Sequence, residues 1–212
     1  MYNRRMHTSR ILIAVVIACM AGAVYGRGNR TDMTVTLKFT PQEGVTSNNV
    51  DLPLALIRQP VNLRVEDARK LTDPLVIGHG TGGNDKIFPI HADSDVIAYV
   101  QETVSDIAKQ WSVNQDKSAG RTLTLQLLRF DVDESNKAVG SVYTSDVKFA
   151  FVMKDARGKT LAEGTGSGST HRYGKGHSGQ NCNEVLSDAL KEAFANVMSN
   201  GELQSAWAAA SR

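Results

Sequence analysis

The sequence predicts an α+β fold, a two-layer sandwich in which two amphipathic helices cover one face of a mostly antiparallel sheet, in the order β-α-β-β-β-α. Two segments carry apolar residues at helical spacing, and three segments of alternating apolar residues lie between them. Short turns join those three segments, which is typical of antiparallel neighbours. The chain has 212 residues, of which 41% are hydrophobic, enough for one domain with a substantial core.

The domain is expected at 58–200. Its first strand is VNLRVEDAR, in which Val61, Leu63 and Val65 share one side. After it, KIFPIH predicts a short strand at an edge or an irregular position, because Pro89 has no amide N–H. Residues 24–57 are expected to form a tether with a possible N-terminal strand in TVTLKF, and residues 201–212 a C-terminal tail.

Both helices are predicted from an apolar face and from capping residues. The first, at about 94–111, has Asp93 or Ser94 as its expected N-cap. Its apolar face comprises Val96, Val100, Val104, Ile107 and Trp111. The second lies in NEVLSDALKEAFANVMSN, with Asn181 or Asn183 as cap and Gly201 at its end. A glycine-rich loop, SGSTHRYGKGHSGQN, is expected before it.

Three strands are predicted between the helices, in RTLTLQLLRF, SVYTSDVKFAFVMKD and KTLAEGTGSGST. Each alternates apolar and polar residues, so one face of each strand is expected to be buried. The connections DESNK and DARGK have the composition of hairpin turns.

Residues 1–23 have the layout of a bacterial export signal. A basic start, MYNRRMHTSR, precedes the short apolar run ILIAVVIA and then small residues. Two cleavage sites remain open. Val16-Ile17-Ala18-Cys19 fits a lipobox with Cys19 as the lipid attachment residue, whereas Ala21-Gly22-Ala23 fits ordinary cleavage after Ala23. The apolar run is too short for a permanent membrane span.

Charge and cysteine content narrow the function classes. No acidic residue precedes Asp32, and without the basic start the 24 basic and 22 acidic residues nearly balance, so no nucleic-acid binding is expected. Only Cys19 and Cys182 are present, which predicts no disulfide framework and a buried Cys182.

The segment LVIGHGTGG (75–83) matches the spacing G-x-G-x-x-G of dinucleotide-binding proteins through Gly78, Gly80 and Gly83. That motif must open a helix, yet NDKIFPIHAD follows and has no helical periodicity. We therefore expect a turning loop here and no cofactor.

For the other candidate sites, a purely structural role explains the sequence better than a functional one. His171, His177 and Cys182 match no standard zinc spacing. Asp131, Asp133 and Glu134 lack the glycine and distant glutamate of a calcium loop, and a solvated turn is expected there. The serines of GTGSGST do not form a nucleophile elbow, and the sequon at Asn29 has little meaning behind a bacterial signal.

The piece VEDAR closes the first strand, and Asp67 and Arg69 share one face of it. They are expected to form a structural ion pair or to contact a partner. Val65, Asp67 and Arg69 resemble the "V-x-D-x-R" strand end of YajG-type bacterial lipoproteins, and Ile77-Gly78 resembles the "IG" step that follows it there. The similarity extends over about 61–200 in the order of its elements.

This resemblance implies a non-enzymatic bacterial envelope protein without catalytic residues. It would be anchored at the periplasmic side of the outer membrane through Cys19, or be soluble in the periplasm if Cys19 is removed. Met20, rather than an aspartate, follows Cys19, which fits outer-membrane sorting. The expected partner is a protein or a cell-wall component. An auxiliary subunit of an envelope transport or assembly complex is the alternative, and a nucleotide-using or hydrolytic enzyme is disfavoured.

Overall fold

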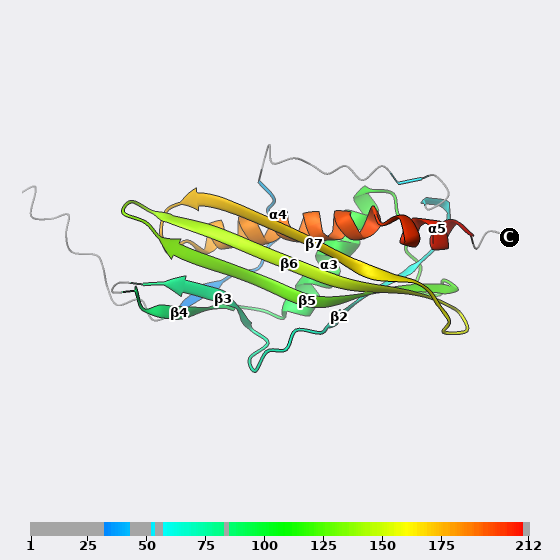
Figure 1. The fold of residues 1–212 in the computed structure, drawn as a ribbon, viewed down its shortest axis with the longest axis horizontal. Coiled ribbons are helices and arrows are strands. Elements are labelled where there is room, and N and C mark those ends of the chain that lie inside the picture. Colours follow the sequence, from blue (N-terminus) through cyan, green and yellow to red (C-terminus); the bar gives the residue numbers. More distant parts are fainter. Residues whose placement is uncertain (1–31, 43–51, 54–56, 83–84, 210–212) are drawn as a thin grey trace, which may run out of the picture.

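The computed structural model describes residues 32–42, 52–53, 57–82 and 85–209. Within them the chain forms one open, mixed sheet of seven strands and three helices, an α+β fold as predicted. The strand order is β1-β4-β3-β5-β6-β7, and β2 pairs with β5 outside this path (Figure 1). The export signal, Cys19 and Asn29 lie outside the described residues.

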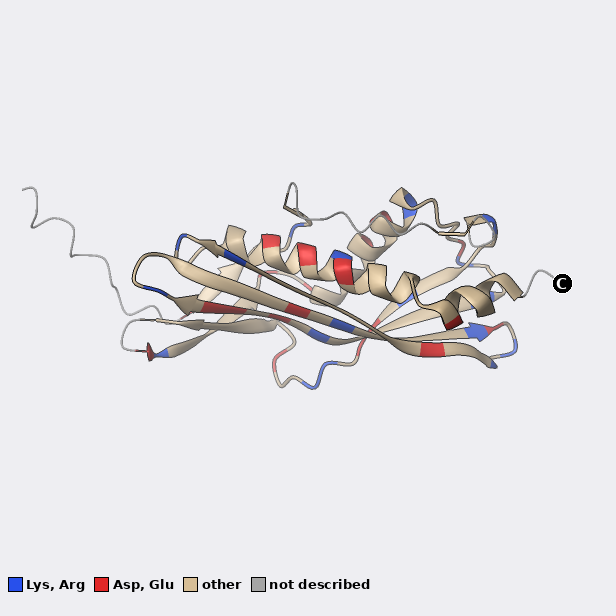
Figure 2. Cartoon of the chain, turned by 45° about the horizontal axis from the view of Figure 1, so that its top comes forward, with Lys and Arg blue, Asp and Glu red and all other residues tan. Residues whose placement is uncertain are grey.

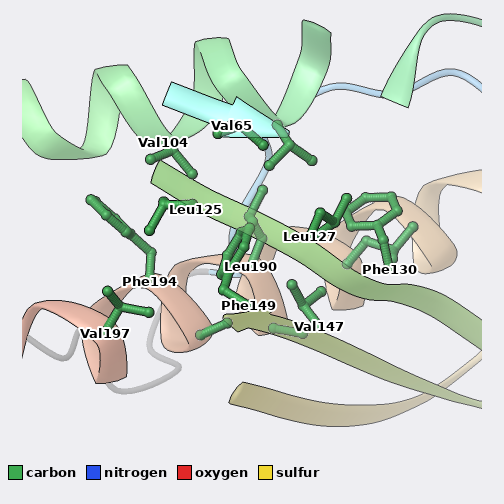
Figure 3. Close-up of a cluster of buried hydrophobic side chains, with 14 of the residues drawn as sticks. Val65, Val104, Leu125, Leu127, Phe130, Val147, Phe149, Leu190, Phe194 and Val197 are labelled. Carbon is green, nitrogen blue, oxygen red and sulfur yellow. The ribbon is translucent and has the colours of Figure 1, made fainter. Parts of the chain in front are cut away.

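Three long strands form the body of the sheet, as their alternation predicted. They are β5 (Arg121–Asn136), β6 (Ser141–Asp155) and β7 (Thr160–Gly174), joined as antiparallel neighbours. Leu125, Leu127 and Phe149 point into the core, which Figure 3 shows between the sheet and the helices. β7 runs through Gly174, so most of the predicted glycine-rich loop is strand, and only residues 175–178 connect it to the next helix.

The strands before the first helix add to the sheet from the other side of β5. β2 (Asn62–Asp67) pairs in parallel with the first half of β5, and β3 (Val76–Thr81) pairs in parallel with its last part. Both strands therefore lie along the same side of β5, one after the other. Between them residues 68–75 leave the sheet and return, and they project from it as a loop in Figure 1.

β4 (Ile87–Ala92) pairs antiparallel with β3 and parallel with β1 (Met33–Val35). The pairing with β1 begins at Ile90, so Pro89 faces no partner on that side. This position suits a residue without an amide N–H. The possible strand of TVTLKF is thus real but shorter and shifted by one residue.

The helices begin at caps other than those predicted. α3 (Val96–Gln110) starts at Asp95, whose Oδ1 accepts from the amides of Ile97 and Ala98 at 2.8 and 3.2 Å. α4 (Gly179–Met198) starts at Ser178, whose side chain accepts from the amide of Asn181 at 3.2 Å. The second helix therefore begins several residues before its apolar repeat, and its first turn is polar.

α3 and α4 contribute to the same hydrophobic core. Val104 of α3 and Leu190 and Phe194 of α4 belong to one cluster with the inward side chains of β5 (Figure 3). The Trp111 ring, at the end of α3, stacks on Phe194 with a 5.2 Å centroid distance. Gly166 and Gly168 of β7 allow the backbone of α4 to approach that strand closely, since a Cβ at either position would lie within 3 Å of α4 backbone atoms.

The segment predicted as a C-terminal tail contains a third helix, α5 (Gly201–Ala209). Leu203 and Trp207 are buried there, with 0% and 1% of their surface exposed. Trp207 Nε1 donates to the carbonyl of Gln59, and Arg121 donates to the carbonyl of Trp207 at 2.8 Å. Residues 201–209 are thus part of the folded domain.

Residues 38–42 of the predicted tether lie against α4. The amides of Lys38, Thr40 and Gln42 donate to side chains of Asn183, Ser187 and Asp188, each at 3.0 Å. This alternation of bonded residues is that of an extended chain. The acidic residues that recur along α4 in Figure 2 are likewise used within the molecule: Asp188 binds this segment, Glu184 pairs with Arg172, and Glu192 accepts from Ser169.

Side chains from the helices also cover the open edges of the sheet. The side-chain oxygen of Gln101 in α3 accepts from the backbone amide of Val65 at 2.7 Å. The side chain of Gln101 thus occupies a backbone group of β2 that a neighbouring strand could otherwise bind. On β7, Asn196 of α4 donates to the carbonyl of Ser167 at 2.7 Å. Such contacts occupy backbone groups that would otherwise be available to another chain.

Candidate functional site

The site indicated by the sequence is the Asp67–Arg69 pair at the end of β2, and the structure brings these two residues together. Arg69 Nε and Nη2 donate to the two carboxylate oxygens of Asp67 at 2.9 and 2.8 Å, a bidentate arrangement. The Arg69 amide also donates to Asp67 at 3.0 Å, and Nη2 reaches the carbonyl of Pro74 at 3.1 Å. Arg69 thereby ties both ends of the loop 68–75 together.

This pair differs in exposure between its partners. The Arg69 side chain is only 3% exposed, whereas that of Asp67 is 33% exposed. The hydrogen bonds from Arg69 lower the pKa of Asp67, and partial burial opposes them only in part. Arg69 Nη1 is buried and has no hydrogen-bond partner among the described residues.

Replacing Arg69 by glutamine is expected to reduce the amount of folding stability that the protein loses when the solution is made acidic. Because the folded-state pKa of Asp67 lies below its unfolded value of about 4, the pair stabilises the fold above that pH. This contribution is lost as pH falls through the folded pKa, and is about 1 kcal/mol or less because Asp67 is partly exposed to solvent. Urea unfolding of wild type and variant at pH 7 and about pH 2.5 measures the difference.

Lys109→Gln, which breaks the exposed pair of Lys109 with Asp106, is the control. A wild-type loss of stability in acid that Arg69→Gln leaves unchanged would contradict a role of Arg69 in the ionisation of Asp67.

A cavity of about 590 Å³ lies beside this pair, between the loop 68–75 and the start of α3. Asp67, Arg69, Pro74 and Leu75 line it from the loop side. The segment 93–97, which includes Asp93 and Asp95, lines it from the helix side. The sequence predicts Asp93 only as a helix cap, and the run DSD ahead of an apolar helix is the signal that points to a second role.

The other residues of the family-like motif hold the strands in place. Val65 and Ile77 are buried, in β2 and β3 respectively. Gly78 has a φ of +148°, and a Cβ there would lie 1.8 Å from the carbonyl oxygen of Val132 on β5. The "IG" step is therefore the point at which the chain returns to β5 after the loop.

The glycine segment is expected to be a turning loop, and this expectation is wrong. Gly78 and Gly80 lie within β3, which pairs with β4 on one side and with β5 on the other. A Cβ on Gly80 would lie 2.2 Å from the ring of Phe88, so this glycine accommodates a neighbouring aromatic side chain. Gly83 lies outside the described residues.

The acidic cluster is likewise on a strand and not in the predicted turn. Asp131, Asp133 and Glu134 belong to β5, and Glu134 is buried with 2% of its surface exposed. Asp131 is paired with Arg129 at 3.2 Å, and Arg129 is 3.6 Å from Asp146. Burial and the nearby Asp131 raise the pKa of Asp133. Asp131 therefore forms an ion pair with a neighbouring arginine, and Glu134 faces the core.

Glu134 anchors the connection between β7 and α4. Its Oε1 accepts from Ser141 at 2.8 Å, from Tyr143 at 3.1 Å and from the amide of His177. The Tyr143 hydroxyl in turn accepts from the amide of Ser178 at 2.9 Å. Burial raises the pKa of Tyr143, and the Glu134 charge adds to this effect. No sequence pattern reveals this network, because His177 lies 43 residues from Glu134 and Ser178 lies 35 residues from Tyr143.

His171, His177 and Cys182 do not gather as metal ligands. His171 lies on β7 and is exposed, whereas Cys182 is buried in α4. His177 packs edge-on against Phe88 with a centroid distance of 5.6 Å. Burial raises the pKa of Cys182, so this side chain is a protonated thiol. Within the described ranges no group of three or more His, Cys, Asp or Glu residues is placed to hold a metal ion.

No helix in the described part of the chain is long and apolar enough to cross a membrane. Among curated proteins, none matches the sequence significantly.

Two solved structures are among those similar to this chain. A Xanthomonas campestris protein of the DUF330 family shares 11% identity and a TM-score of 0.50, over 82% of this chain and 96% of its own. A minor lipoprotein from Acinetobacter baumannii shares 8% identity and a TM-score of 0.40, over 68% and 91% of the two chains. At such low identity, the likeness to the Xanthomonas protein concerns the fold alone.

A family model described as "uncharacterized lipoprotein" matches residues 54–207, from before β2 to the buried Trp207 of α5. This range covers most of the chain and the whole Asp67–Arg69 site. The chain belongs to this family of bacterial lipoproteins.

Proposed function

We propose that the protein is a non-enzymatic, YajG-type lipoprotein of the bacterial outer membrane, acylated at Cys19, which faces the periplasm and binds a protein or a cell-wall component. The observation that carries this proposal is the lipoprotein family match over residues 54–207, in a chain whose start has a lipobox at Val16-Ile17-Ala18-Cys19. Met20 after Cys19 supports outer-membrane sorting.

The chemistry of the described side chains supports a binding role rather than catalysis. A catalytic base and nucleophile must lie within hydrogen-bonding reach of each other. Here Cys182 is a buried, protonated thiol, and Glu134 is occupied by the groups that hold the start of α4. Asp67 and Arg69 neutralise each other.

The distance between the lipid and the domain supports a position close to the membrane. The first described strand is β1, and residues 20–32 lie between it and Cys19 in the sequence. A fully extended chain of that length spans roughly 45 Å. Because residues 38–42 are bound along α4, the chain beyond β1 adds nothing to this reach.

Metabolic labelling with radiolabelled palmitate is expected to label the wild-type protein but not Cys19→Ala. The sulfur of Cys19 is the proposed point of acylation, so its removal leaves no acceptor. Cys182→Ala is the matched control and is expected to keep the label, because Cys182 is buried. An unlabelled wild type, or a labelled Cys19→Ala variant, would show that the proposed anchor is wrong.

A further inference from the structure

Three large apolar side chains are exposed at the end of the sheet that carries the hairpin between β5 and β6. Val139 in this hairpin, Ile87 at the start of β4 and Tyr173 near the end of β7 expose 77%, 74% and 58% of their surface. They are the three most exposed large hydrophobic residues in the described ranges. We call this end, formed by residues 85–87, 137–140 and 173–175, the hairpin end; it lies on the left in Figure 1.

The register of the sheet brings these side chains to one level. Ile87 lies level with Ser135 of β5 through the pairings of β4 with β3 and of β3 with β5. Tyr173 lies level with the same residue through the pairings of β7 with β6 and of β6 with β5. The tip with Val139 projects between them, and a Cβ on Gly140 would lie 2.9 Å from the Tyr173 hydroxyl oxygen. The three apolar groups therefore belong to one surface.

Lysine side chains flank these apolar groups. Lys86, Lys137 and Lys175 are each within two residues of one of them, and all three are exposed. None of the three forms an ion pair with a described residue. Asp85 is the only acidic residue of the hairpin end, so its net charge is positive. Exposed apolar and tyrosine side chains beside lysines suit the headgroup region of an anionic bilayer.

The first described strand begins at the same end. β1 pairs in parallel with β4, and its first residue, Met33, is level with Ile90, three positions from Ile87. Residues 20–32 lie between β1 and Cys19 in the sequence, so the proposed lipid is at most roughly 45 Å from the start of β1. A domain held from that side meets the membrane with its hairpin end. The opposite end of β6, a strand of 15 residues, is roughly 45 Å away.

We infer that the hairpin end lies against the anionic lipid surface that carries the anchor. Ile87, Val139 and Tyr173 are placed at the level of the headgroups, and the three lysines are placed at the lipid phosphates. The lysines favour a lipid surface over a second copy of this chain, because a symmetric contact would bring the same cations face to face. This inference rests on the acylation proposed above, and it adds the orientation of the domain on the membrane.

The test uses the protein as purified from cells, with a fluorescent dye attached to Ala138→Cys or, as the matched control, to Ala156→Cys. Both alanines are exposed and lie in hairpin tips at opposite ends of β6. Cys182 is buried and is not expected to react, and Cys19 is either acylated or removed with the signal. In vesicles of phosphatidylglycerol and phosphatidylcholine with nitroxide-labelled headgroups, the dye at residue 138 is expected to be quenched several-fold more strongly than the dye at residue 156.

Replacing all three lysines of the hairpin end by glutamine tests the contribution of charge. Quenching at residue 138 is expected to fall to the level that the unsubstituted protein shows in vesicles of phosphatidylcholine alone. The control replaces three exposed lysines toward the other end of the sheet, Lys117→Gln, Lys154→Gln and Lys159→Gln, and is expected to keep the original quenching. Equal quenching at residues 138 and 156, stronger quenching at residue 156, or an equal loss in both triple variants would each overturn the inference.

The result is separate from that of palmitate labelling, which reports on Cys19 alone. A palmitate-labelled protein whose dye is quenched equally at both positions would retain the anchor and reject the orientation. An unlabelled protein that is quenched selectively at residue 138 would retain the membrane contact of the hairpin end and reject the anchor.

Discussion

Replacing Gly78 by alanine is expected to destabilise the domain by on the order of 4 kcal/mol, the largest effect of a single methyl group that we anticipate in this fold. Gly78 has a φ of +148°, and a Cβ there would lie 1.8 Å from the Val132 carbonyl oxygen and 2.8 Å from the Val132 nitrogen. Those atoms belong to the backbone of a central strand and cannot rotate away. Thermal unfolding is expected to show a melting temperature lower by roughly 8–16 °C.

Gly120→Ala is the control for this experiment. A Cβ placed on Gly120 would have no other atom within 4 Å, and this residue does not need a positive φ. Its replacement is expected to change stability by no more than about 0.5 kcal/mol. If both variants melted at the wild-type temperature, the close approach of β3 to β5 at Gly78 would be refuted.

Truncating Trp207 to alanine is expected to cost about 3–5 kcal/mol, because its indole is buried in the core. The ring is 1% exposed, and its Nε1 donates to the carbonyl of Gln59 at 3.3 Å. Trp207→Phe retains most of the apolar contact and is expected to lose less. Chemical denaturation measures both, and the slope with denaturant should stay constant if the domain unfolds as one unit.

Ser205→Ala, at an exposed position of the same helix, is the control. It tests the effect of an alanine in α5 without removing a buried side chain. Alanine favours the helix, so this variant is expected to be at least as stable as wild type. A Trp207→Ala variant as stable as Ser205→Ala would mean that α5 does not dock on the domain.

The parts of the fold that can be predicted well from the sequence are those specified by local periodicity. α3 is found within one or two residues of its predicted bounds, and β5, β6 and β7 alternate as expected. A long helix or strand carries many apolar residues along one face. A shift in its register would therefore expose several of these side chains at once.

The errors arise where a distant contact decides the outcome. The composition of LVIGHGTGG suggests a turn, yet β4 and β5 hold it as a strand on both sides. Glu134 is predicted in a solvated turn, but Ser141, Tyr143 and His177 provide the donors that allow its burial. The predicted cap at Asn181 or Asn183 is wrong because Ser178 begins the helix, while Asn183 holds the chain at Lys38.

Two residues of the candidate site, Asp67 and Arg69, can be recognised from the sequence. The spacing of Asp67 and Arg69 predicts either an ion pair or a contact with a partner, and the structure shows the ion pair, with Asp67 at the end of β2 and Arg69 just after it. Their meeting with Asp93 and Asp95 is not predictable, because it requires β2 and β3 to lie along the same side of β5 and the start of α3 to return to the loop between them.

Side-chain periodicity along single elements is therefore sufficient to specify the two main helices, the three long strands and the apolar face of each. Three other features exist only once the chain has folded: the glycine segment as a paired strand, α5 as part of the core, and the cavity that brings Asp93 and Asp95 near Arg69. They depend on backbone hydrogen bonds and packing between residues far apart in the chain, whose free energy outweighs local conformational preference.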